Sequence, residues 1–135
     1  MGAKLDLDLI HSINLFSKIT RVQTNQCFRY NNWLIFAVPP KLLPKALGER
    51  GDNIKQLSRM MKTKVKVIPE SSIEPFVISI IYPLKFKRLT FENNEVTIFA
   101  GPNSKASLIG REKVRAAELE RILKGQFNIK ELKIV

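Results

Sequence analysis

The sequence predicts an α+β protein with layered helices and sheets, built from two copies of one α-β-β-α-α-β unit, residues 1–69 and 70–135. The sequence aligns with itself at an offset of 62 residues. Runs with helical spacing and short β-prone runs follow one another in the same order in both halves. Each half also has an Asn-Asn pair and a glycine turn at matching positions. No flexible linker separates the copies, so we expect them to pack as one rigid unit.

In the first copy, apolar residues at helical spacing predict an amphipathic helix over residues 6–18. Two β-prone runs follow, residues 22–30 and 33–38. Asn31-Asn32 between them predicts a tight hairpin turn, because asparagine tolerates positive φ. A short helix is expected over residues 41–47.

A glycine turn, Gly48 to Gly51, follows this short helix. Asp52 is then expected to be the N-cap of a helix that ends near Lys62. A strand over residues 65–68 completes the first copy.

The second copy begins with Ser71 and Glu74 in a capping-box pattern, which predicts a helix ending near Tyr82. Propensity alone favours a strand for residues 76–81, but the repeat requires a helix there. The other elements expected are strands over 86–92 and 95–100 around the turn Asn93-Asn94, a short helix over 104–109, a long helix over 114–124 with Gly125 as C-cap, and a strand over 127–135.

The chain is strongly basic, with 23 Lys+Arg against 12 Asp+Glu and a net charge of +11. A charge of this size on a small protein favours a polyanionic partner. Residues 1–69 hold 12 basic and 4 acidic residues, and residues 70–135 hold 11 and 8. The first half is therefore expected to dominate salt-dependent attraction to phosphates.

A single Cys27 and a single His11 exclude an intramolecular disulfide and a cysteine-based metal site. The chain has no P-loop and no paired catalytic residues, so we expect no enzyme, no metal and no cofactor. No apolar run is long enough to span a membrane, and no signal-peptide pattern begins the chain. We expect a cytoplasmic monomer.

The Gly48–Gly51 turn is the strongest functional signal. A G-x-x-G turn between two helices, followed by a strand, is typical of KH modules, which clamp single-stranded RNA. Ile54, Leu47 and residues 65–68 are expected to form the wall of a base-binding groove. The RNA-binding residues expected in the first copy are Lys41, Lys45, Gly48, Glu49, Arg50, Gly51, Asn53, Ile54 and Lys55.

Two carboxylates, Glu49 and Asp52, oppose anion binding at this turn. The alternative without a binding role is a plain helix–turn–helix connection, which the order of helices and strands on both sides of the turn disfavours. Most Phe side chains are assigned to the core, and a base-stacking role for Tyr30 and Trp33 is left open.

In the second copy the last glycine of the turn is replaced by Lys113. Positive φ would strain a lysine, so an ordinary helix start is expected, with the ammonium acting as a point charge. A structural relic is the alternative. The RNA-binding residues expected here are Gly110, Arg111, Lys113 and Arg115.

Taken together, these segments resemble archaeal NusA-like transcription factors over nearly the whole chain. The matching residues are 16–20 (Phe-Ser-Lys-Ile-Thr), Cys27, 47–57, 65–70, 74–76, Pro83 and 107–111. The resemblance implies two type II KH domains fused into one RNA-binding surface. It also implies a role in transcription elongation, pausing, termination or antitermination, with RNA polymerase or other transcription proteins as partners.

The family's usual turns read I-G-K-x-G and I-G-R-x-G, so Glu49 stands for a lysine and Lys113 for a glycine. The leading hypothesis is therefore a non-enzymatic binder of single-stranded RNA. The alternative is a KH-fold protein-interaction factor, or a ribosome or RNA-polymerase assembly factor, with weakened RNA binding.

Overall fold

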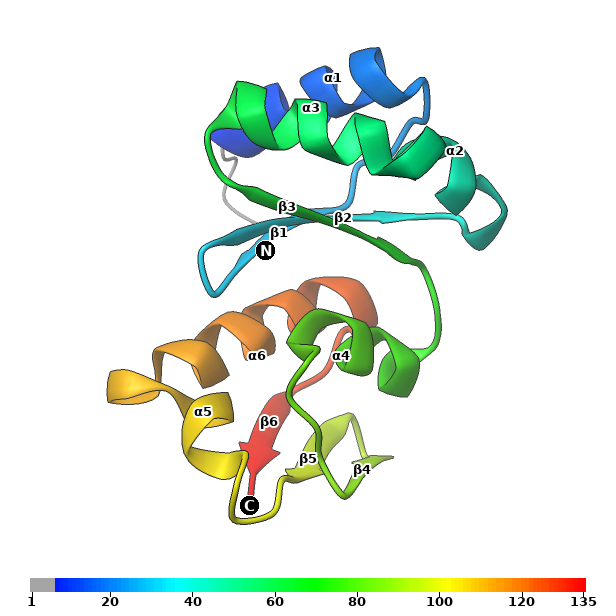
Figure 1. Cartoon of the computed structure of the whole chain (residues 1–135). Helices are drawn as coiled ribbons and strands as arrows, with labels where there is room; N and C mark the ends of the chain where they lie inside the picture. Colours follow the sequence, from blue (N-terminus) through cyan, green and yellow to red (C-terminus); the bar gives the residue numbers. More distant parts are fainter. Residues whose placement is uncertain (1–6) are drawn as a thin grey trace. The chain divides into compact units, whose positions relative to one another are not determined.

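Both halves of the chain have the element order α-β-β-α-α-β, as the repeat predicts (Figure 1). The structure, a computed structural model, describes residues 7–135. Contacts divide the chain into two units, Met1–Ser71 and Ser72–Val135. Each unit has one three-stranded sheet, so the protein is of the mixed α+β class.

In the first unit, the sheet order is β1-β2-β3, with β1 and β2 antiparallel and β2 and β3 parallel. Asn31 and Asn32 have φ values of 52° and 65°, which confirms the predicted hairpin turn. The elements are α1 (Leu7–Thr20), β1 (Cys27–Tyr30), β2 (Trp33–Val38), a 3-10 turn (Pro40–Leu42), α2 (Leu43–Leu47), a second 3-10 turn (Glu49–Gly51), α3 (Asp52–Met61) and β3 (Lys64–Pro69).

The second unit repeats this topology in the order β4-β5-β6, again with one antiparallel and one parallel pair. Its hairpin turn at Asn93 and Asn94 also has positive φ. The elements are α4 (Ile73–Ile81), β4 (Arg88–Glu92), β5 (Glu95–Phe99), α5 (Lys105–Ile109), a 3-10 turn (Arg111–Lys113), α6 (Val114–Phe127) and β6 (Glu131–Ile134).

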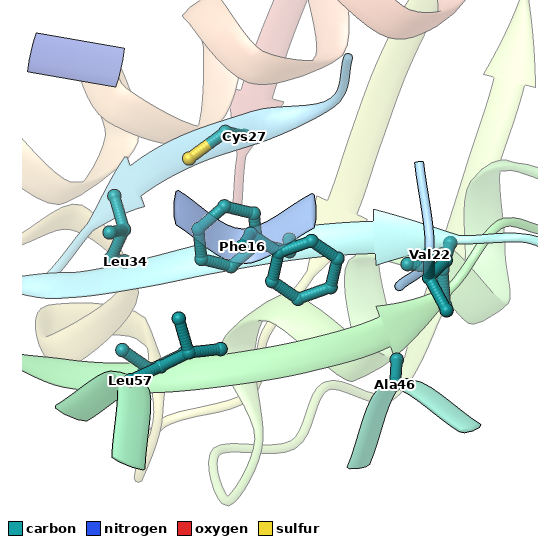
Figure 2. Packing of buried hydrophobic residues seen from close by; sticks show 9 residues of the cluster. Phe16, Val22, Cys27, Leu34, Ala46 and Leu57 are labelled. Atoms are coloured by element: carbon teal, nitrogen blue, oxygen red, sulfur yellow. The ribbon is translucent and has the colours of Figure 1, made fainter. Parts of the chain in front are cut away.

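The core of the first unit lies between the sheet and its helices, and Figure 2 shows part of it. Phe16 of α1 stacks on Phe36 of β2, with ring centroids 4.2 Å apart. Leu57 of α3 and Ala46 of α2 are fully buried in the same cluster. Cys27 is buried here too, as a small hydrophobic residue. This packing fixes α2 and α3, the two helices on either side of the glycine turn.

The predicted strand over residues 22–30 is shorter than expected. Side chains bond to the main chain across residues 20–26. Gln26 also bonds to β2 through its backbone, since its carbonyl accepts from the Ala37 N–H at 3.0 Å. The Thr20 hydroxyl accepts from the Val22 N–H at 3.1 Å. The Thr24 hydroxyl donates to the Ala37 carbonyl at 2.6 Å. The predicted first helix extends to Thr20, and its first predicted residue, Asp6, lies outside the described residues.

In the second unit, residues 73–81 form a helix, so the prediction from the repeat is confirmed over propensity. The capping-box prediction is wrong, because Ser72 rather than Ser71 is the N-cap. Gly125 is also not a C-cap. The long helix continues to Phe127 and ends at Asn128, whose backbone is left-handed. The ring of Phe127 packs edge-on against Phe76, with ring centroids 5.2 Å apart.

Candidate nucleic-acid interface

The two turns between the paired helices have almost identical backbones. Gly48 and Gly110 both have φ 78°, with ψ of 170° and 169°. This region of φ and ψ is essentially restricted to glycine. The first glycine of each turn is therefore required by backbone conformation.

Close packing reinforces that requirement. A Cβ on Gly48 would lie 2.8 Å from Cγ of Asn53, and a Cβ on Gly110 would lie 2.9 Å from the backbone N of Arg115. Residues 53 and 115 are 62 positions apart, so each copy packs the equivalent residue onto its first glycine. Neither glycine can accept a side chain without moving the following helix.

Asn53, predicted to bind RNA, also has a structural role. Its Nδ2 donates to the carbonyls of Lys45 at 3.1 Å and Ala46 at 3.2 Å, and so ties the end of α2 to α3. Arg115, its counterpart, pairs with Glu118 one helical turn later, and both side chains are largely covered. Part of its charge is therefore offset before any ligand arrives.

The prediction that Lys113 would adopt an ordinary helix start is wrong. Lys113 has φ 64° and ψ 22°, which match the 71° and 21° of Gly51. Arg50 and Glu112, one residue earlier, are also left-handed, at φ 56° and 54°. A left-handed conformation costs a non-glycine residue about 1–2 kcal/mol. The second turn therefore retains the shape of the first at a conformational cost.

The prediction that Asp52 caps α3 is also wrong: Gly51 is the N-cap, and Asp52 is the first helical residue. The N–H groups of residues 50–53 stand at the start of α3, where a helix N-terminus offers donors to an anion, but two of these four are used inside the turn. Gly51 N–H donates to the Gly48 carbonyl at 3.1 Å, and Asp52 N–H donates to the Glu49 carbonyl. Arg50 and Asn53 supply the other two N–H groups of this set.

The charged side chains of both turns face solvent, but their order is inverted. Glu49 corresponds to Arg111, and Arg50 corresponds to Glu112. Additional exposed cations of the first unit lie on the elements before and after its turn: Lys41, Lys45 and Lys55. The predicted residues of each unit therefore lie on its glycine turn or on the helical elements before and after it.

An open groove of about 690 Å³ lies beside α3 in the first unit. It includes two predicted binding residues, Ile54 and Lys55, and the predicted wall residue Val65. The other predicted wall residues, Leu47 and residues 66–68, do not line it. The complete lining is Trp33, Asp52, Ile54, Lys55, Gln56, Ser58, Arg59, Lys64 and Val65.

Two cations of this groove, Arg59 and Lys64, were absent from the predicted site. Arg59 follows Lys55 by four residues, so helical periodicity places both on one face of α3. Lys64 pairs with Trp33 in the parallel register of β2 and β3. That register was not readable from the sequence.

Nearby, burial lowers the pKa of Lys66. Tyr30, the other aromatic considered for stacking, is buried.

Among residues 7–135, no three His, Cys, Asp or Glu side chains lie together in a way that could hold a metal ion. Within the same range, no helix has both the length and the apolar character needed to cross a membrane.

Comparison with known proteins gives a similar fold. A scan against protein-family models finds no match, and no curated protein matches the chain. Among solved structures, the crystal structure of APE1850 is similar, with a TM-score of 0.65 and 24% sequence identity. The similarity covers 97% of this chain and 100% of that one. At this identity the likeness shows a shared fold across both units.

Proposed function

We propose that this chain is a non-enzymatic single-stranded RNA-binding protein composed of two tandem type II KH domains. The observation that carries the proposal is the first turn, Gly48–Gly51, set between two packed helices and beside a groove. A KH module holds RNA in this way, with its glycine turn on the sugar-phosphate backbone and its bases in the adjoining groove.

Space at the turn supports this function. A Cβ added to Gly51 would meet no atom within 4 Å, so this glycine borders open space at the start of α3. Another backbone can therefore approach the turn closely. The exposed guanidinium of Arg50 is suited to a phosphate there.

Charge supports it as well. The net charge of +11 favours a polyanion, and Lys55, Arg59 and Lys64 line the groove itself. A nucleic acid in this position is attracted in a salt-dependent manner, since binding releases condensed counterions. The resemblance to archaeal NusA-like factors makes nascent RNA the proposed target, in transcription elongation, termination or antitermination in the cytoplasm.

The test compares two glycine-to-aspartate variants of the full chain. Gly51→Asp adds a carboxylate at the turn, where aspartate tolerates a left-handed backbone. Gly125→Asp makes the same charge change at an exposed glycine of α6 with no atom near its added Cβ. Fluorescence anisotropy with short, unstructured, labelled RNA measures the affinity of each.

We expect micromolar binding by the natural chain, weakening steeply as salt rises. Gly51→Asp should weaken it by about tenfold, equivalent to ~1.4 kcal/mol, and Gly125→Asp should have little effect. Equal affinities for all three folded proteins would refute the assignment of the turn.

A protein-interaction or assembly role is the second candidate. The exposed carboxylates of Glu49 and Asp52 at the turn favour it, because they repel an anion. A pull-down with and without RNase separates the two functions. Partners lost after RNase treatment support RNA binding, whereas partners that persist, with no RNA affinity in the anisotropy assay, support the second candidate.

A further inference from the structure

Trp33 stands apart from the rest of its strand. It is the first residue of β2, and it alone in that strand is not buried. The five residues after it all have buried side chains. Trp33 also lines the groove beside α3. A large ring is thus left partly open to the same space that holds Ile54 and Lys55.

Cations surround this ring. The Nζ atoms of Lys64 and Lys66 each lie 5.4 Å from its centroid. Arg59 lines the same groove. The groove's one acidic lining residue, Asp52, is at the start of α3 next to the turn. The part of the groove that contains Trp33 therefore combines an aromatic surface with positive charge.

We propose that Trp33 is a stacking platform for an unpaired base of bound RNA, with Lys64 and Arg59 contacting the adjacent phosphates. The inference rests on the proposed function and adds a binding position beyond the glycine turn. Aromatic side chains bind bases of single strands by stacking, and basic residues alongside track the backbone.

The distance from the turn suits one continuous strand. From Asp52 to Arg59, α3 rises about 10 Å, at 1.5 Å per residue. A KH turn holds about four nucleotides, so a strand held at Gly48–Gly51 extends along α3 toward Trp33. The bases then pass Ile54, a partly exposed apolar residue of the groove lining.

The competing explanation is purely structural: the ring covers the aliphatic parts of the two lysines and shields the strand end. Under that explanation a Trp33 substitution changes the stability of the protein, but it does not change the difference in affinity between a strand with bases and an abasic strand. The test therefore requires a measurement specific to stacking.

Trp33 is the only tryptophan of the chain, so its emission reports directly on this position. The full chain is titrated with oligo(A), oligo(U) and an abasic strand of the same length. Anisotropy of labelled strands gives affinity, and tryptophan emission gives contact with the ring. We expect oligo(A) to quench the emission strongly, and the abasic strand to bind without that quenching.

Trp33→Leu should weaken oligo(A) binding by about 5- to 150-fold, the range for one stacked base. It should change neither binding of the abasic strand nor the salt dependence, because the phosphate contacts remain. Trp33→Phe keeps an aromatic ring and should retain most of the affinity, as the matched control. If Trp33→Leu fails to fold, the emission titration of the natural chain with oligo(A) and the abasic strand decides the question.

The possible failures are distinguishable. If RNA binds with unchanged Trp33 emission, or if folded Trp33→Leu binds oligo(A) like the natural chain, the stacking inference is wrong while the proposed function stands. If no strand binds at all, the proposed function itself fails, and the inference fails with it.

Discussion

The two turns, Gly48–Gly51 and Gly110–Lys113, share one backbone and differ in nearly all their side chains. Both begin with a glycine in a region closed to other residues. Both close with a hydrogen bond of 3.1 Å from the fourth N–H to the first carbonyl. The first glycine and its packing against the following helix therefore set the shape of the turn. The last residue is open to substitution at a modest cost.

The substitutions redistribute charge around this common shape. The second turn carries its cations inside the loop, at Arg111 and Lys113. The first turn contains Glu49 and Arg50, and its surplus of cations lies on neighbouring elements. At the positions equivalent to Lys41, Lys45 and Lys55, the second unit has Asn103, Ser107 and Ala117. The proposed phosphate contacts are therefore expected to come from the loop itself in the second unit, and mainly from the neighbouring elements in the first.

The largest expected effect is the loss of either first glycine. Gly48→Ala and Gly110→Ala should each destabilise their own unit by about 2–4 kcal/mol, from the clash and the forbidden backbone together. Urea unfolding followed by Trp33 emission reports on the first unit, and far-UV circular dichroism reports on both. Tolerance of alanine at one position would show that the two turns are not equivalent.

A smaller effect is expected from the residues that pack on these glycines. Asn53→Ala removes two hydrogen bonds to the end of α2 and should cost about 1–2 kcal/mol. Arg115→Ala removes the largely covered ion pair with Glu118 and should cost less, at most about 1 kcal/mol. Thermal unfolding of the two variants measures the difference, and equal losses would contradict the bracing role assigned to Asn53.

Exchanging the last residues of the two turns, Gly51 and Lys113, should change the stability of the two units in opposite directions. Lys113→Gly should stabilise the second unit by about 1 kcal/mol, because it removes a left-handed lysine. Gly51→Lys should destabilise the first unit by a similar amount, since its surroundings are open and only backbone strain is added. Chemical denaturation of both variants checks these signs; a stabilising Gly51→Lys would remove the strain argument.

The smallest expected effects concern charge. Glu49→Arg should strengthen RNA binding by about three- to tenfold at low salt, and Arg111→Glu should weaken it similarly. Both differences should shrink as salt rises. The control Glu74→Arg makes the same charge change at an exposed position on α4, outside both turns. If this control strengthened binding equally, net charge rather than the turn would explain the effect.

Most of the fold was predictable because its signals are repeated. Each Asn-Asn pair marks a hairpin, and comparison of the halves identified α4 as a helix despite its β-branched residues. The ends of elements were not predictable. Thr24 bonds to the Ala37 carbonyl through its side chain, and Phe127 extends α6 to reach Phe76. These ends depend on tertiary contacts that no local pattern records.

The candidate site, like the fold, was predictable in its position along the chain but not in its local detail. Sequence spacing located both turns, but it assigned Asp52 to a cap position that Gly51 occupies. It also gave Lys113 an ordinary helical conformation, whereas this residue is left-handed. Arg59 was missed although its four-residue spacing from Lys55 is readable in the sequence. Lys64 joins the site only through the β2–β3 register, which the sequence does not record.

The packing of Asn53 on Gly48, and of Arg115 on Gly110, has a consequence for finding such turns in other genomes. A search for two glycines three residues apart finds the first turn and overlooks the second. A better search template is one glycine followed five residues later by a side chain that lies against it. Turns that have lost their last glycine while retaining their shape would then be detected.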